Sequence, residues 1–260
     1  MAFLNADGYE RLMGRWSQRL APRLLEFAGV RDGDRVLDVG AGTGSLPLAV
    51  LAATRRSEVV GIDPSGPYIT FARSRTSDPR VRFEVGDAQA LSHPDASFDK
   101  TLALLVMNFI PDARTAAAEM RRVTRPGGVV AAAVWDYGEG MGMLRTFWDA
   151  AVALDPDAQG RHERHMPYCR KGELAALWTA KEFKEIRETA LEMSMDFASF
   201  EDFWQPFLTG QGPSGSYATN LAPQRQHALR ERLRQDLLKG EQDGPFALQA
   251  RAWAVRGVVP

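Results

Sequence analysis

The sequence has little cysteine: Cys169 is the single thiol among 260 residues. One thiol excludes a disulfide within the chain and any zinc or iron–sulfur site that needs several thiolate ligands. The N-terminal stretch MAFLNADGYERLMGRW contains acidic residues and no uninterrupted apolar core, so it does not resemble a signal peptide. We therefore expect no metal site and a cytoplasmic, reducing compartment.

An excess of one charge is also lacking. Thirty-two Lys and Arg residues face thirty-three Asp and Glu residues, which leaves a formal net charge of −1. Such a chain has no strong overall field to attract nucleic acid or an anionic membrane. The apolar run LALLVMNFI, residues 102–110, is too short to span a bilayer. We predict neither nucleic acid nor membrane as a partner, and leave the oligomeric state open between monomer and homodimer.

Short apolar runs alternate with stretches of helical periodicity from residue 35 to about residue 135. This alternation is typical of α/β proteins in which βα units build a mostly parallel sheet. The predicted strands are Arg35–Val39, Glu58–Ile62, Val81–Val85, Lys100–Val106 and Val129–Trp135. The predicted helices are Ser45–Ala53, Gly66–Arg75 and Asp112–Thr124.

The flanking regions are mainly helical in pattern. Before the first strand, apolar residues recur at helical spacing from Trp16 to Phe27, although Pro22 should kink or divide that helix. After residue 136 we expect helices near Met143–Leu154, Lys171–Ala180 and Pro223–Leu238, and strands at Phe183–Met195 and Phe246–Val255. The aromatic run from Phe197 to Phe207 has helical spacing, which is compatible with core packing or with an apolar substrate pocket.

A glycine-rich loop follows the first predicted strand in the segment VLDVGAGTG, residues 36–44. Glycines let the backbone turn tightly and approach a ligand. The dinucleotide fingerprint requires a further glycine where this chain has Ser45, so the loop alone does not identify a cofactor. Asp38, inside the strand, is suited to meet a cationic or amino group rather than a pyrophosphate.

Two more acids follow the next two strands. Asp63 ends the second strand and is suited to accept two ribose hydroxyls, whereas Asp87 follows the third and is suited to accept from an amino group of a base. Because the carboxyl ends of parallel strands meet at one edge of a sheet, we expect Asp38, Asp63 and Asp87 to surround one ligand at the switch point of the sheet.

Five ordered segments resemble one known family: VLDVGAGTG, VVGIDPS, VRFEVGDAQAL, SFDKTLALLVMNFI and EMRRVTRPGG. They are similar to the class I S-adenosylmethionine-dependent methyltransferases, and most to the branch with ubiquinone and menaquinone C-methyltransferases and many small-molecule methyltransferases. The resemblance implies a Rossmann-like three-layer sandwich whose seven-stranded, mostly parallel sheet has an antiparallel last strand. We expect one domain, with a helical arm at 1–32, a cofactor-binding core at 33–136 and cap insertions at 137–182 and 197–244.

The resemblance also implies residues that bind S-adenosylmethionine. The methionine part would be held by Asp38 and by Gly40, Ala41, Gly42, Thr43 and Gly44. The ribose would be held by Asp63 with Pro64 and Ser65, and the adenine by Asp87 and Ala88. Leu105 and Val106 would line the sulfonium side, and Tyr9 and Arg15 in the arm would close over the cofactor, with Arg15 pairing with the methionine carboxylate.

The methyl acceptor is not identified by the sequence. The fourth strand ends in Val106-Met107-Asn108-Phe109 rather than in the Pro-Pro motif of nucleobase amino-methylation, and no cysteine follows a proline, so a small organic acceptor is favoured. The candidates for orienting or deprotonating it are Asn108, Asp136, Tyr137 and His165. Two alternatives stay open: a protein that binds S-adenosylmethionine without catalysis, and an NAD-dependent oxidoreductase.

Overall fold

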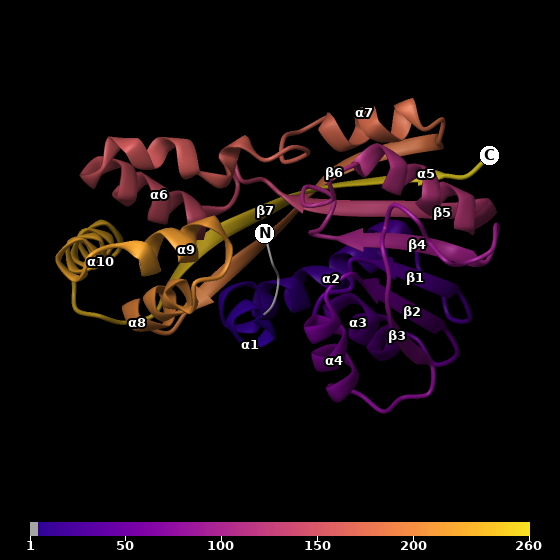
Figure 1. Cartoon of the computed structure of the whole chain (residues 1–260), viewed down its shortest axis with the longest axis horizontal. Coiled ribbons are helices and arrows are strands. Elements are labelled where there is room, and N and C mark those ends of the chain that lie inside the picture. The colour runs from indigo at the N-terminus through magenta and orange to yellow at the C-terminus, as the bar shows by residue number, and fades with distance from the viewer. Residues whose placement is uncertain (1–4) are drawn as a thin grey trace.

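The computed structural model describes residues 5–260, which form one seven-stranded sheet covered by helices (Figure 1). The strand order is β3-β2-β1-β4-β5-β7-β6. Strands β1 to β5 run parallel, and β7 is antiparallel to both β5 and β6. The predicted mostly parallel sheet with an antiparallel last strand is confirmed. The strands are β1 (Arg35–Val39), β2 (Glu58–Asp63), β3 (Val81–Val85), β4 (Phe98–Leu104), β5 (Thr124–Trp135), β6 (Lys184–Phe197) and β7 (Phe246–Val258).

Strand β4 ends two residues earlier than the apolar pattern predicts. Leu105 has a left-handed backbone (φ 62°), which no extended strand accommodates, although its N–H still donates to the carbonyl of Ala133 (2.8 Å). Strand β5 begins earlier than predicted because Thr124 already pairs with Phe98.

Helices cover both faces of the sheet (Figure 1). One face carries α2 (Arg15–Ala28), α3 (Ser45–Ala53) and α4 (Gly66–Ser74), and the other carries α5 (Ala113–Val123) and α7 (Glu173–Ala180). The α5 helix begins at an N-cap, Asp112, whose carboxylate accepts from the N–H groups of Arg114 and Thr115 (both 3.0 Å). No helix within residues 5–260 is long and apolar enough to cross a bilayer.

The N-terminal arm consists of α1 (Ala6–Tyr9), a π-helical turn η1 (Glu10–Gly14) and α2. The expectation that Pro22 divides the arm is wrong, because α2 continues through it. Pro22 and Gln18 are both exposed, so the Gln18 carbonyl that loses its helical donor faces solvent. Buried residues on both sides of Pro22, among them Trp16 and Leu24, hold the helix against the protein.

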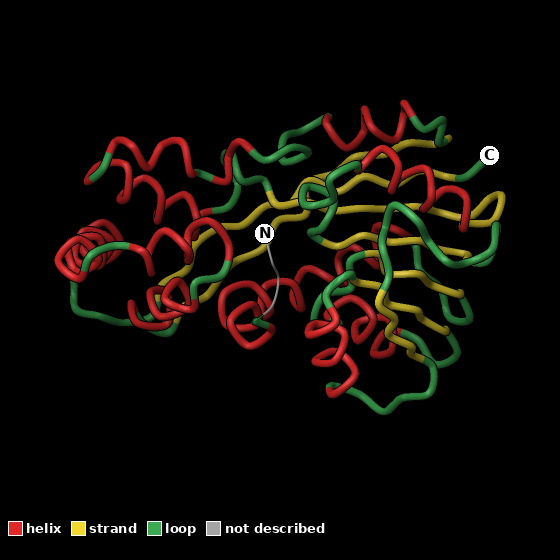
Figure 2. The backbone as a smooth tube through the Cα atoms, viewed as in Figure 1, coloured by secondary structure: helices red, strands yellow, loops and turns green. Residues whose placement is uncertain are grey.

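Two insertions follow the carboxyl ends of β5 and β6 and gather beyond one end of the sheet (Figure 2). The first contains α6 (Gly142–Leu154), η2 (Pro156–Arg161) and η3 (Glu163–His165), and the second contains α8 (Phe200–Trp204), η4 (Gln205–Thr209), α9 (Gly212–Asn220) and α10 (Pro223–Leu238). They pack on one another: the ring of Phe147 in α6 stacks on that of Phe207 in η4, with centroids 4.5 Å apart. The aromatic run from Phe197 to Phe207 therefore contributes core packing.

We expect Leu24→Ala to destabilise the protein by about 2–5 kcal/mol, because it leaves a cavity beneath α2 where Leu24 is fully buried. Leu154→Ala is the matched control, since Leu154 is 48% exposed at the end of α6. Urea denaturation of the two variants measures the difference. Equal losses of unfolding free energy would show that α2 is not anchored through this face.

Candidate active site

The glycine-rich loop after β1 is tied to the end of β2. The N–H groups of Gly40 and Ala41 both donate to the carbonyl of Ile62 (2.8 Å each). Gly40 has a left-handed backbone (φ 76°), and a Cβ there would lie 2.4 Å from Cγ2 of Val106. Only glycine permits this conformation together with such a close approach to the end of β4. The loop therefore brings the ends of β1, β2 and β4 together.

Asp63 is held at the end of β2 by two backbone donors. Its Oδ2 accepts from the N–H of Gly42 (2.9 Å) and its Oδ1 from that of Ser65 (2.8 Å). Burial raises the pKa of Asp63, and these two hydrogen bonds partly offset the effect. Each carboxylate oxygen can accept a further bond, so the fixed Asp63 carboxylate suits a pair of hydroxyl donors such as those of a ribose.

Asp38 is a buried carboxylate with no ion-pair partner among residues 5–260. It is 1% exposed, and no group in residues 5–260 hydrogen-bonds to its Oδ1. Burial, and then the neighbouring charge of Asp63, raise the pKa of Asp38 well above its usual range. A bound cation would relieve both effects. The α-ammonium and sulfonium groups of S-adenosylmethionine fit this requirement, whereas the pyrophosphate of NAD would add to the repulsion.

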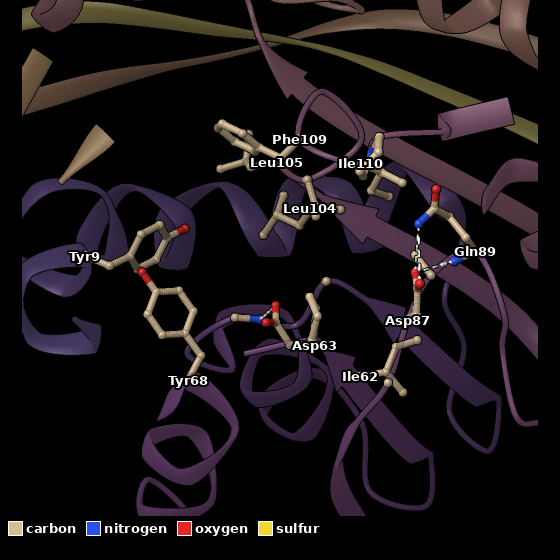
Figure 3. Close-up of a pocket in the computed structure, with 17 residues that line it drawn as sticks. Tyr9, Ile62, Asp63, Tyr68, Asp87, Gln89, Leu104, Leu105, Phe109 and Ile110 are labelled. Carbon is tan, nitrogen blue, oxygen red and sulfur yellow. Dashed lines mark hydrogen bonds between the residues drawn. The ribbon is translucent and has the colours of Figure 1, made fainter. Parts of the chain in front are cut away.

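Gly40, Gly42 and Asp63 line a cavity of about 230 Å³, whereas the buried Asp38 does not belong to its lining (Figure 3). At one end the rings of Tyr9 and Tyr68 lie side by side, with centroids 5.6 Å apart, and at the other lie Asp87 and Gln89. Oδ1 of Asp87 accepts from the N–H of Gln89 (2.8 Å). Above the Asp63 carboxylate lies an apolar wall made by Leu104, Leu105, Phe109 and Ile110.

Most residues predicted to bind a cofactor line this cavity. They are Tyr9, Gly40, Gly42, Asp63, Pro64, Asp87, Ala88, Leu105 and Val106. Other residues of the loop do not line the cavity but hold the loop in place. The N–H of Gly44 donates to the carbonyl of Ala41 (2.8 Å), and the hydroxyl of Thr43 donates to Glu10 in the arm (2.5 Å). Sequence reasoning missed Tyr68 in α4 and Gln89, Phe109 and Ile110 in the segments between β3 and α5.

Arg15 lies elsewhere. Its guanidinium pairs with Asp202 in α8 (2.8 Å) and lies over the ring of Trp16, 4.3 Å from its centroid. It does not line the cavity. The structure gives no support to a contact between Arg15 and the methionine carboxylate, because this side chain joins the arm to the second insertion instead.

A second, smaller cavity of about 60 Å³ adjoins the first. Three residues, Tyr9, Leu105 and Phe109, line both cavities. Leu105, whose backbone is left-handed, lies at this shared wall. The rest of the second cavity is lined by Leu12, Met13, Trp135, Tyr137, Leu144, Glu163, Met166, Gln211, Gly212, Pro213 and Ser214.

The four predicted acceptor-side residues differ in their placement. Tyr137 lines the second cavity. Asn108 lies beside Tyr137 and its amide donates to Sδ of Met166 (3.3 Å). The buried Asp136 forms an ion pair with Arg251 of β7 (2.6 Å). This contact gives Asp136 a structural role that links the end of β5 to β7. His165 is exposed and does not line the cavity.

Glu163 is the acceptor-side residue that sequence reasoning missed. It is only 4% exposed and lines the second cavity. In the sequence it lies within Arg161-His162-Glu163-Arg164-His165, a charged stretch typical of a solvated surface. Its burial depends on contacts with distant segments, which the local pattern does not contain.

Comparison with known proteins agrees with this geometry. Residues 36–128 match the family model of a methyltransferase domain. The 27-O-demethylrifamycin SV methyltransferase of Amycolatopsis mediterranei is 39% identical over 117 residues, which are 44% of this chain and 43% of that protein. Residues 36–128 are thus similar to a methyltransferase domain, and the chain resembles the class I S-adenosylmethionine-dependent methyltransferases in sequence over this segment.

Other proteins are similar to this chain over longer stretches. An uncharacterised protein of Mycobacterium tuberculosis is 30% identical over 177 residues, covering 65% of this chain and 63% of that protein. The chain thus spans less than two thirds of these relatives. The structure of Haemonchus contortus phosphoethanolamine N-methyltransferase 2 with S-adenosylmethionine has a TM-score of 0.60 at 19% identity, covering 98% of this chain and 56% of that one. At this identity the likeness shows the fold.

We expect Asp38→Asn to stabilise the ligand-free protein at neutral pH. The folded-state pKa of Asp38 is raised, so its favourable contribution is complete at acid pH and is lost as the pH rises through that pKa. Asparagine removes the buried charge. Denaturation midpoints measured from acid to neutral pH should therefore diverge in favour of the variant as pH rises. A pH-independent difference would mean that Asp38 is not an isolated buried charge.

Proposed function

We propose that this protein is an S-adenosylmethionine-dependent methyltransferase whose acceptor is a small organic molecule. The observation that carries the proposal is the shared wall of the two cavities. Methyl transfer from a sulfonium is an in-line displacement, which requires the nucleophile on the far side of the methyl group from sulfur. Adjoining cavities that meet at Tyr9, Leu105 and Phe109 provide this arrangement.

The larger cavity has the chemistry that the methyl donor requires. Asp63 would accept hydrogen bonds from the ribose hydroxyls and Asp87 from the adenine amino group, while Leu104 and Ile110 offer apolar contact to the base. The unpartnered carboxylate of Asp38, which is buried outside this lining, would stabilise the α-ammonium charge. When bound, S-adenosylmethionine supplies an electrophilic methyl group. The role of the protein is then to align the two ligands and exclude water.

The smaller cavity supports a small, largely apolar acceptor. Aromatic and aliphatic side chains make most of its lining, and Glu163 is the one carboxylate among the described residues that line it. The chain has one buried cysteine and nearly balanced charge, which is compatible with action on a metabolite in the cytoplasm.

Two alternatives make different predictions. A protein that only binds S-adenosylmethionine would leave a methyl-labelled cofactor unconsumed in a metabolite extract. An NAD-dependent oxidoreductase would bind NAD, which the unpaired Asp38 disfavours. Calorimetry with S-adenosylmethionine, S-adenosylhomocysteine and NAD should show binding of the first two alone, and the labelled methyl group should appear in an extract component. Binding of NAD alone would overturn the proposal.

We expect Asp63→Ala to weaken S-adenosylhomocysteine binding by about 10- to 100-fold, because hydrogen bonds to a charged group contribute about 1.5–3 kcal/mol each. Calorimetry provides the dissociation constant. Asp157→Ala is the matched control, since Asp157 is exposed on the first insertion. Thermal unfolding of both variants separates loss of binding from loss of folding, because Asp63 also holds Gly42 and Ser65. Unchanged affinity in a folded Asp63→Ala variant would show that the ribose contact is misassigned.

A further inference from the structure

Glu163 faces the smaller cavity without a cationic partner. Its carboxylate accepts from the indole N–H of Trp148 in α6 and from the backbone N–H of Ser214 in α9 (3.1 Å). Both donors are neutral, and no Lys or Arg within residues 5–260 forms an ion pair with Glu163. Burial raises the pKa of this carboxyl group, and the two hydrogen bonds only partly offset the effect.

The position of Glu163 has a structural explanation in part. Ser214 lies in the first turn of α9, where the helix dipole favours a negative charge, and Trp148 belongs to the other insertion. Glu163 thus connects the two insertions. Each hydrogen bond uses a different carboxylate oxygen, so this connection also accounts for a carboxylate rather than an amide. It does not account for the place of Glu163 in the lining of the smaller cavity.

Other titratable groups near the cavity are poorly suited to accept a proton. Burial raises the pKa of Tyr9 to about 12 and raises that of Tyr137 further, so both phenols stay protonated at neutral pH. His162 stacks on Trp148, outside the cavity lining, and its pKa is lowered to about 4 by burial and by nearby Arg164. His165 is exposed.

We propose that Glu163 is a catalytic residue that accepts the proton of the methyl acceptor's nucleophilic group, and that the acceptor is therefore an apolar small molecule bearing a hydroxyl or an amine. This inference rests on the proposed function. The O–H or N–H bond breaks and its proton moves to a Glu163 oxygen. The freed electron pair forms the bond to the methyl carbon, and the carbon–sulfur bond breaks with its pair remaining on sulfur. Glu163 returns the proton to solvent after product release.

The test uses two variants that break the same hydrogen bond. Glu163→Gln removes the proton acceptor and disturbs the contact with Trp148, whereas Trp148→Phe removes the indole donor but keeps the carboxylate. We expect Glu163→Gln to slow methyl transfer about 100-fold or more, as for loss of a general base. Trp148→Phe should slow transfer by about tenfold, the lower end for loss of one hydrogen bond to a charged group, because the carboxylate keeps its bond from Ser214 and can still accept a proton. Glu139→Gln is the exposed control.

Rates are measured as transfer of a ¹³C-labelled methyl group from S-adenosylmethionine to a metabolite extract, with S-adenosylhomocysteine affinity measured in parallel for each variant. The ¹³C shift of the wild-type product identifies the atom that is methylated, and we expect oxygen or nitrogen. A methyl group on carbon or sulfur would overturn the acceptor class. Equal slowing in Glu163→Gln and Trp148→Phe, or an unimpaired Glu163→Gln, would overturn the role of Glu163. Failure of the wild type to bind S-adenosylhomocysteine or transfer the label would instead overturn the proposed function.

Discussion

Two backbone hydrogen bonds to one carbonyl organise the site. The N–H groups of Gly40 and Ala41 both end on the Ile62 carbonyl, so the loop after β1 is fixed to the end of β2. The same loop donates from Gly42 to Asp63, which aligns that carboxylate. Because these contacts use the backbone, they depend on glycine conformations and strand register more than on side-chain chemistry. Asp38 and Asp63 are close together as a result, and their repulsion favours a cationic ligand.

The sheet and the larger cavity were largely predictable from sequence. Strands β1 and β3 have the predicted bounds because each is a short segment rich in valine between turn-forming residues, and in β3 apolar residues alternate with Arg82 and Glu84. The acids at the strand ends could be placed because a parallel sheet brings its carboxyl ends to one edge. Prediction was less accurate where a single residue decides the backbone. Leu105 ends β4 through a left-handed conformation that its sequence does not suggest. Pro22 does not divide α2, because the Gln18 carbonyl that loses its helical donor lies in an exposed part of the helix.

The acceptor side could not be predicted because its residues depend on contacts between distant segments. Glu163 lies in a charged run but is buried by Trp148 and by Ser214, which is 51 residues further along the chain. Arg15 seemed suited to a carboxylate ligand, yet it pairs with Asp202, 187 residues away. Asp136 likewise pairs with Arg251. These pairings are set by how the insertions pack on each other and on the arm, and by the pairing of β5 with β7, and local patterns carry no information about them.

Tyr9 belongs to the N-terminal arm and also to the walls of both cavities. In a methyltransferase the Tyr9 ring would contact the donor on one side and the acceptor on the other. A position of the arm that favours binding of one ligand would therefore change the surface that the other ligand contacts. The two binding equilibria are then thermodynamically linked, and linkage is mutual: the factor by which bound donor changes the affinity for acceptor equals the factor by which acceptor changes that for donor. In such a protein the arm would be one element, beside the segment with Leu105 and Phe109, through which each ligand could affect the binding of the other.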